Sequence, residues 1–244
     1  MTPRELSDMI DVRLNAYAQQ AFFGNATPVP SIEVDEYEKS VALTKAQKDL
    51  IIDIYTGKTL PSFEEKERSR EALDSLVKTY TTSEVLVGAD HFEDDKHIFT
   101  SFAIPSKLLW IIVENAQYAE NACVCASERH VDVIPVQHDE LLRILKNPFR
   151  GPRLHRVLRL NSADNTVELV SDYPIGSYML RYIEEPNPII LVELPDGLSI
   201  DGKTAVQSGS LPDFLHEEIV ERAVTLILQS KSIITNRQGN NKTT

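Results

Sequence analysis

Histidines beside acidic residues are the pattern in this sequence that comes nearest to catalytic chemistry. His138 precedes Asp139 and Glu140, which places a base next to two carboxylates, as a hydrolase could use. Catalytic groups usually converge from separate segments, whereas neighbouring residues at a helix start diverge. Acidic residues there also suit the helix dipole without any catalysis. We therefore interpret this segment as a helix start, and a hydrolase that uses His138 stays a minor alternative.

A second such segment could hold a divalent cation. His91 is followed by Glu93, Asp94 and Asp95, which offer oxygen ligands. Their spacing is not that of a calcium-binding loop, so a polar loop is the simpler interpretation.

Cys123 and Cys125 form a C-x-C pair, and no second Cys/His pair at zinc spacing accompanies it. Two buried thiols are therefore expected instead of a metal site. Motifs of phosphate-binding loops, serine hydrolases, zinc proteases and dinucleotide-binding folds are absent from the sequence. The sequence thus predicts a protein that is not an enzyme and has no cofactor and no metal.

The strongest charge feature is a basic segment in an acidic chain. The net charge is -12, yet no acidic residue lies between Glu140 and Asp164. Six basic residues fall in or beside this interval: Arg143, Lys146, Arg150, Arg153, Arg156 and Arg159. Three interpretations stay open, namely a solvated face, pairing with an acidic stretch of a neighbouring subunit, and contact with DNA. The last is disfavoured because aromatic residues that could stack on bases are sparse here.

Acidic stretches that could pair with this segment lie elsewhere in the chain. The first contains Glu64, Glu65, Glu67 and Glu71, and the second is the pair at residues 184 and 185. The six basic residues and the four glutamates of the first stretch are the candidate subunit-interface residues.

Composition sets the broad class. A chain of 244 residues with 42% hydrophobic residues can bury a core without metals or disulfides. No apolar run approaches the ~20 residues that span a bilayer, and the first residues do not resemble a secretory signal. We expect a protein that forms in a cytoplasm and binds no membrane.

Helical signals dominate the first third of the chain. Residues 3–23 repeat apolar positions at helical spacing, and a proline-containing connector follows at residues 25–30. Thr44 and Gln47 have the form of a capping box, with Gly57 as the helix end. A second capping box at Ser62 predicts a helix that buries Leu73, Leu76 and Val77 and extends toward residue 80.

From about residue 85 short apolar runs alternate with turn residues, which indicates antiparallel strands. The expected strands are residues 98–103, 111–118, 131–136, 154–160, 166–170, 177–183 and 189–192. Val167 and Leu169 should face inward with Glu168 outward, and Trp110 should lie in the core. A short helix is expected at residues 138–145 and an amphipathic helix at 212–230.

The expected fold class is therefore α+β. It has N-terminal helices, an antiparallel β-sheet core, a C-terminal helix packed on that sheet, and extended terminal arms. The expected regions are a helical part at residues 1–84, the sheet with its helix at 85–232, and a polar tail at 233–244.

Three segments together resemble a known family. They are Leu43-Thr-Lys-Ala-Gln47 with Phe63-Glu64, then Val133-Ile-Pro-Val-Gln-His-Asp-Glu140 with Lys146-Asn-Pro-Phe149, and last Tyr178-Met-Leu-Arg-Tyr-Ile183, Pro186-Asn-Pro-Ile-Ile-Leu191 and Leu215 to Val224. In this order they are similar to a structural protein family of crAss-like bacteriophages, whose members form rings of the head–tail connector. The similarity extends over residues 40–230, with a departure at Glu185-Pro-Asn-Pro188.

The resemblance implies a homo-oligomeric ring, a dodecamer, below the portal protein in the virion. Other ring or tail proteins would be partners, DNA would pass the channel without specific binding, and assembly would occur in the host bacterial cytoplasm. The alternatives are another phage tail structural subunit, such as a tail hub or accessory protein, the hydrolase above, and a bacterial cytoplasmic binding module.

Overall fold

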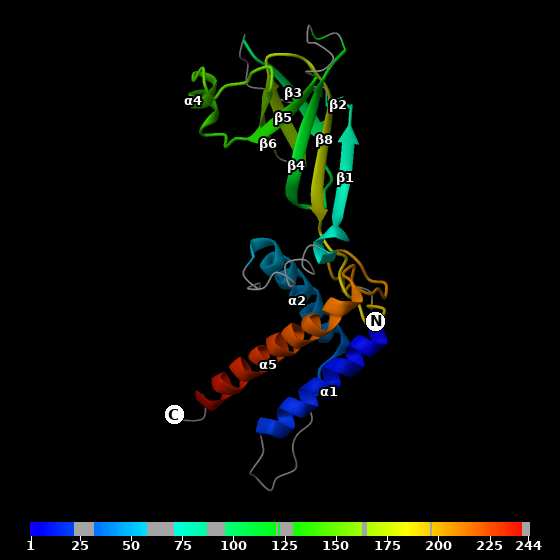
Figure 1. The fold of residues 1–244 in the computed structure, drawn as a ribbon. Coiled ribbons are helices and arrows are strands. Elements are labelled where there is room, and N and C mark those ends of the chain that lie inside the picture. Colours follow the sequence, from blue (N-terminus) through cyan, green and yellow to red (C-terminus); the bar gives the residue numbers. More distant parts are fainter. Residues whose placement is uncertain are drawn as a thin grey trace. The chain divides into compact units, whose positions relative to one another are not determined.

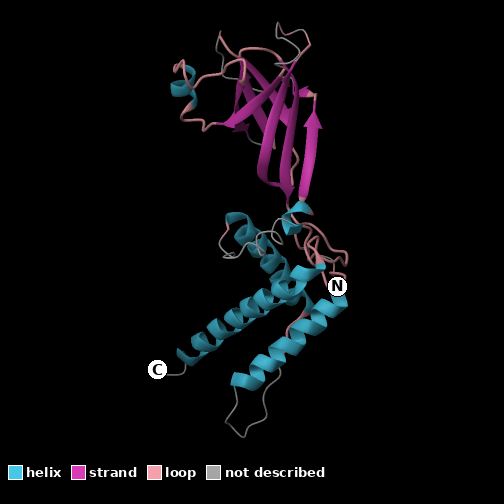
Figure 2. Ribbon diagram, in the orientation of Figure 1, coloured by secondary structure: helices cyan, strands magenta, loops and turns pink. Residues whose placement is uncertain are grey.

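The computed structural model describes residues 1–21, 32–57, 71–86, 96–120, 122, 129–162, 165–195 and 197–240. The chain divides into two compact units. A helical unit contains Met1–Leu76 with Pro186–Thr244, and a sheet unit contains Val77–Glu185. Helices dominate the first and strands the second, as Figures 1 and 2 show. The predicted α+β class is confirmed.

Helix α1 (Pro3–Ala21) and helix α2 (Glu36–Thr56) form the first part of the helical unit. Asp35 caps α2, because its Oδ2 accepts a hydrogen bond from the Tyr37 backbone N–H at 3.3 Å. Gly57 ends the helix in the left-handed conformation at φ 71°, as predicted. The predicted start at Thr44 is wrong, since α2 begins eight residues earlier.

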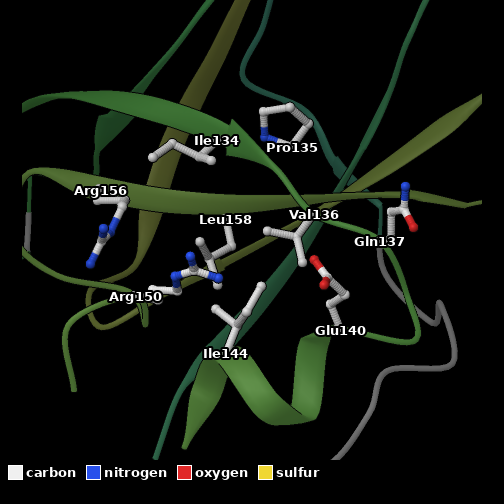
Figure 3. A pocket seen from close by; sticks show the side chains of 9 residues that line it. All are labelled: Ile134, Pro135, Val136, Gln137, Glu140, Ile144, Arg150, Arg156 and Leu158. Atoms are coloured by element: carbon white, nitrogen blue, oxygen red, sulfur yellow. The ribbon is translucent and has the colours of Figure 1, made fainter. Parts of the chain in front are cut away.

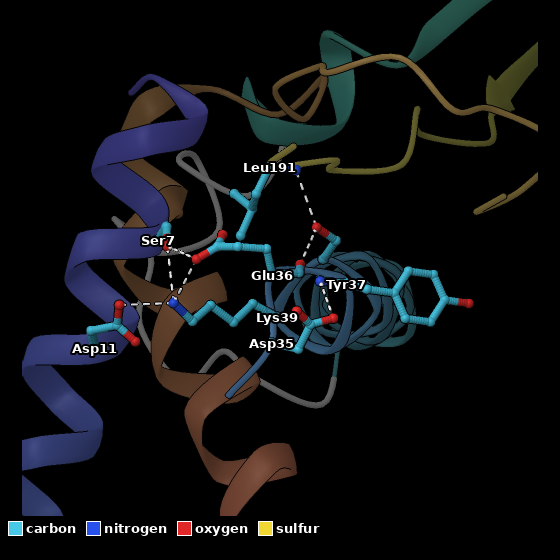
Figure 4. A network of polar contacts seen from close by, with 8 residues as sticks. Ser7, Asp11, Asp35, Glu36, Tyr37, Lys39 and Leu191 are labelled. Carbon is cyan, nitrogen blue, oxygen red and sulfur yellow. Dashed lines mark hydrogen bonds and ion pairs between the residues drawn. The ribbon is translucent and has the colours of Figure 1, made fainter. Parts of the chain in front are cut away.

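A buried lysine joins α1 to α2 (Figure 4). Lys39 Nζ lies 2.8 Å from Asp11 Oδ2 and 2.8 Å from Glu36 Oε1, and it donates a hydrogen bond to Ser7 Oγ at 3.1 Å. Burial alone would lower the pKa of Lys39, but the two carboxylates outweigh it and hold the pKa above its ordinary value. The lysine therefore stays charged and paired between the helices.

Polar side chains in the middle of α2 bind an irregular segment instead of water. Thr44 Oγ1 accepts from the Ile189 N–H at 3.1 Å and donates to the Ile189 carbonyl at 3.3 Å. Ser40 Oγ accepts from the Leu191 N–H, and Gln47 Nε2 donates to the Asn187 carbonyl. Residues 189–192 are therefore not the predicted strand, because α2 satisfies much of the backbone that a neighbouring strand would otherwise pair.

Replacing Thr44 with valine should lower the free energy of unfolding by about 1–3 kcal/mol, because it leaves buried backbone groups of Ile189 without partners. Valine keeps the side-chain shape, so the loss reports the hydroxyl group. Thr44→Ser keeps the hydroxyl and should lose much less. Urea unfolding of both variants measures the difference, and equal losses would show that the hydroxyl is unimportant.

Helix α5 (His216–Asn240), preceded by the 3-10 turn η2 (Asp213–Leu215), completes the helical unit. Its apolar stripe contacts α2 and α1. The buried residues of this stripe are Ile219, Val220, Ala223, Val224 and Ile227. Arg222 Nη1 also binds Asp53 Oδ2 of α2 at 2.6 Å. The amphipathic pattern predicted a helix that packs on the sheet, but α1 and α2 cover this stripe instead.

The expected terminal arms are helical in the described residues. Helix α1 begins at Pro3, and α5 continues to Asn240 through most of the predicted polar tail. No glycine or proline occurs between Pro212 and Gly239, so the sequence does not interrupt α5 before its last turn. The proline-containing connector at residues 25–30 lies outside the described residues.

Eight strands form one mixed sheet in the order β1-β8-β4-β5-β6-β7-β3-β2. Their bounds are β1 Val77–Thr82, β2 Val85–Leu86, β3 Ile98–Ala103, β4 Leu108–Tyr118, β5 His130–Pro135, β6 Arg156–Ser162, β7 Thr166–Ser171 and β8 Ile175–Glu184. All neighbouring pairs of this sheet are antiparallel except β5 with β6. Strand β1 begins at Val77, where the sequence predicted the end of a helix. Residues 71–74 are helical, and residues 58–70, where the predicted helix begins, lie outside the described residues.

The sheet curls, and its two edge strands follow each other directly in the sequence. Strands β1 and β2 are its terminal strands, yet only Ser83 and Glu84 separate them. The inner face encloses the core of this unit. Its fully buried large members include Phe102, Tyr118, Leu169 and Tyr178. Trp110, predicted to be in the core, is only half-buried.

Helix α4 (Leu141–Leu145) covers part of the outer face. Leu141 and Ile144 pack against Leu158, Leu160 and Val170 of β6 and β7. A parallel strand pair needs a crossover connection, and the segment that contains α4 is the crossover between β5 and β6. Val167 and Leu169 face the inner core as predicted, whereas the outward Glu168 is buried as well, since this part of the sheet is covered on both faces.

Candidate subunit interface

Residues 146–156 connect α4 to the first residue of β6 and carry four of the six predicted basic residues; we call this segment the basic loop. Asn147 starts a tight turn in it. Its Oδ1 accepts from the Phe149 N–H at 2.9 Å, and its carbonyl accepts from the N–H groups of Arg150 and Gly151 at 3.1 and 3.0 Å. Gly151 is buried, and a Cβ there would lie 3.3 Å from the Asn147 carbonyl oxygen. The sequence Asn-Pro-Phe-Arg-Gly therefore fixes a compact turn.

Two arginines hold the carbonyl groups of this turn. Arg156 Nε donates to the Gly151 carbonyl at 3.1 Å, and its Nη2 donates to the Phe149 carbonyl at 2.6 Å. Arg153 donates to the Pro148 carbonyl, and its guanidinium lies 5.9 Å from the centre of the Phe149 ring. The loop is thus pre-organised with the Phe149 side chain 78% exposed.

The six predicted basic residues have three different environments. Arg143, Lys146, Arg150 and Arg153 are exposed, and Arg156 is half-buried beneath the loop. Arg143 also forms an ion pair with Glu140. Arg159 lies inside the curled sheet with 7% of its surface exposed. The basic segment is therefore not one continuous solvated face.

Arg159 belongs to a buried charged cluster that the sequence did not predict. Its Nε lies 2.8 Å from Oε2 of Glu114, without a well-directed hydrogen bond, and both side chains are 8% exposed. The hydroxyl of Tyr178 donates to the same Glu114 oxygen at 2.9 Å. Both charged residues line an opening of about 450 Å³, together with Trp110. A lone acidic residue within an apolar strand, Glu114, is the signal that could have indicated the cluster.

Burial determines how these groups titrate. It raises the pKa of Glu114 above its ordinary value, although Arg159 and the Tyr178 hydroxyl oppose the shift. Burial, with the nearby Glu114, also raises the pKa of Tyr178. A carboxylate held by one guanidinium inside the fold connects β4 to β6, and we interpret it as a structural cross-link.

A pocket of about 490 Å³ lies next to the basic loop (Figure 3). Its apolar wall consists of Ile134, Val136, Ile144 and Leu158, and the side chains of Arg150, Arg156 and Glu140 also line it. Such a lining can accept an apolar group that carries a neighbouring negative charge. It offers adhesion to a partner, and its charged residues do not converge on a reactive centre.

Most of the acidic residues of the predicted interface lie in a part of the chain that the structure does not describe. Glu64, Glu65 and Glu67 lie outside the described residues, and Glu71 is exposed in the helical residues 71–74. The His91 segment and the cysteines at residues 123 and 125 also lie outside them. Pairing of these glutamates with the basic residues stays a prediction.

The histidine that a hydrolase would need is engaged with the backbone. His138 Nε2 lies 2.6 Å from the Asn161 carbonyl oxygen, so this nitrogen carries the proton and donates it. The neighbouring Glu140 pairs with Arg143. Within the described part of the chain, no group of three or more His, Cys, Asp or Glu side chains is placed to hold a metal ion. Nor is any described helix of the length and apolar character that a membrane span requires.

The described residues thus form a two-unit α+β chain with a pre-organised loop and an apolar pocket beside it. The comparisons give the particular family. A model described as phage tail ring protein 3/4 matches residues 1–239. Ring protein 3 of Bacteroides phage crAss001 is 41% identical over 238 residues, which cover 96% of this chain and 98% of that protein. Ring protein 4/5 of the same phage is 27% identical over 93% of this chain and 92% of its own length.

The chain therefore belongs to the phage tail ring protein 3/4 family and is a structural subunit of a phage ring. The predicted similarity to ring proteins of crAss-like phages is confirmed. All three segments that carried it have described parts in the fold. The first and third meet where α2 binds residues 187–191. The second contains the end of β5, the N-cap residue of α4 and the start of the basic loop.

Proposed function

We propose that this chain forms a ring of twelve copies in the head–tail connector of a crAss-like phage virion, where it links the portal protein to the tail. The observation that carries the proposal is the similarity to Ring protein 3 over 98% of that protein. A second ring protein of the same phage is similar over 92% of its length. This supports a stack of related rings, of which this chain builds one.

Neighbouring subunits in the proposed ring contact each other through charged surfaces. The basic loop contributes exposed cations in a chain whose net charge is -12, and acidic residues such as Glu71 are available as partners. Complementary charge on one chain can set the register between copies. The same net charge disfavours tight binding of the DNA that passes through the channel. Assembly takes place in the host bacterial cytoplasm before the virion is released.

Mixing the purified chain with the portal protein of the same phage tests this proposal. Mass photometry and negative-stain electron microscopy should show closed rings of one size that bind the portal. A chain that stays monomeric and ignores the portal would contradict the proposal.

One observation favours a second position of the ring in the virion. The description of the matching family places its ring proteins in the phage tail. In that case the ring belongs to a tail hub or an accessory part of the tail. Rings that form normally but bind a tail protein instead of the portal would support this alternative.

A further inference from the structure

The basic loop presents an unusual side chain for a surface. Phe149 is the most exposed of the large apolar side chains in the described residues, at 78%. Arg153 and Arg156 fix the turn that carries Phe149. Little conformational freedom is therefore lost when the phenyl ring of Phe149 becomes buried. Rigid exposed aromatic residues with neighbouring arginines are typical anchors of protein interfaces. Lys146, Arg150 and Arg153 add positive charge around the anchor.

A groove of about 490 Å³ in the helical unit has the opposite character. Tyr17 and Leu226 give it apolar walls, and Asp49, Glu218, Glu221 and Arg222 also line it. Three carboxylates and one guanidinium belong to the lining, and Arg13 of α1 adds a second cation beside it, since its Nη1 lies 2.5 Å from Glu221 Oε1. Glu221 is therefore paired within the chain, and the groove keeps a net negative charge. Arg222 is already engaged, since it lies 2.6 Å from Asp53 and 2.9 Å from Glu218. We call this site the acidic groove.

We propose that Phe149 of one copy inserts into the acidic groove of a second copy, with the cations of the basic loop against the carboxylates of the groove. The phenyl ring fits a groove of this volume, and the charges around the two surfaces are complementary. The inference rests on the ring assembly of the proposed function and names the contact between its subunits. In this proposal the basic loop binds the acidic groove, and not the stretch Glu64–Glu71 that the sequence suggested as its partner.

The two surfaces are different parts of the chain, so a contact between two copies is heterologous. Each copy then offers its loop to one neighbour and its groove to another. Contacts of this kind repeat head to tail and close into a ring when the rotation between copies permits. The proposal therefore needs no second type of subunit.

Single variants test each side of the contact in the full-length chain. Phe149→Ala and Arg150→Glu should each raise the dissociation constant between subunits by roughly tenfold or more, as expected at an interface hot spot. Asp49→Lys should do the same from the groove side, and it leaves the ion pair between Arg13 and Glu221 in place. Phe214→Ala removes a phenylalanine that is 46% exposed elsewhere, and it should leave assembly unchanged. Circular dichroism checks that each variant is folded.

The double variant Arg150→Glu with Asp49→Lys restores opposite charges, and it should regain rings that both single variants lose. Mass photometry over a concentration series, with and without portal protein, measures this recovery. Rings of the Phe149→Ala variant that are as stable as the original would overturn the contact alone. Single losses without recovery in the double variant would also overturn it. An original chain that never assembles would overturn the proposed function and this contact together.

Discussion

Replacing Arg159 with methionine should lower the free energy of unfolding by about 3–5 kcal/mol at pH 7, because it leaves the Glu114 carboxylate buried without its cation. The two groups are only 8% exposed and 2.8 Å apart, so solvent does not compensate for the loss. Methionine fills similar space, and the change therefore reports the charge more than the packing. Urea unfolding at constant ionic strength measures the effect.

The pH dependence of this loss identifies its cause. Burial already raises the pKa of Glu114 above its ordinary value of 4.5, and removal of Arg159 takes away a group that lowers it. The carboxyl in the variant therefore binds a proton more readily in the folded state than in the unfolded state. Stability lost at pH 7 should return as the pH falls toward that ordinary value. A loss of equal size at pH 7 and pH 5 would contradict this explanation.

A double variant supplies the control. Glu114→Gln together with Arg159→Met contains no buried charge, so it should be more stable than Arg159→Met alone. If both variants unfold at the same urea concentration, the buried carboxylate is not the source of the instability.

Replacing Ile51 with alanine should lower the free energy of unfolding by about 2–5 kcal/mol, because the side chain is fully buried in the helical unit. Ile52, the next residue of α2, is 42% exposed and provides a matched control. Ile52→Ala makes the same chemical change in the same helix and should cost less than about 1 kcal/mol. Urea unfolding followed by circular dichroism compares the two, and similar losses would show that the buried face of α2 is wrongly assigned.

Local sequence patterns predicted where most strands lie better than they predicted how the strands pair. The expected strand at residues 98–103 coincides with β3, and the strands around β4, β6, β7 and β8 differ by a few residues at their ends. The parallel pairing of β5 with β6 was not predicted, since alternation of apolar residues contains no information on strand direction. The amphipathic stripe of α5 likewise predicted burial but could not specify that α1 and α2 would cover it.

The polar residues of α2 show why one helix start was misplaced. Thr44 and Gln47 have the spacing of a capping box, yet both lie well inside the helix. Their side chains bind the backbone of residues 187 and 189, more than a hundred positions away. A local motif cannot distinguish these two uses of a hydroxyl and an amide. The same contacts explain why the first and third segments of the family resemblance occur together.

The environment of the basic residues was predictable only in part. Four of the six cations between Glu140 and Asp164 are exposed, and their role in a subunit interface stays a prediction. The sequence could not show that Arg156 holds loop carbonyls or that Arg159 points into the core. Those roles depend on which face of β6 the curled sheet encloses, and on a turn whose partners come from its own backbone.

A side-chain-resolution electron microscopy map of the virion around the portal and the tail tests the central proposal most directly. We expect a closed ring of this chain between the two, with Phe149 of every copy buried in the acidic groove of the next. A map in which the chain is absent from this region, or occurs there as isolated copies with Phe149 exposed to solvent, would contradict the proposal.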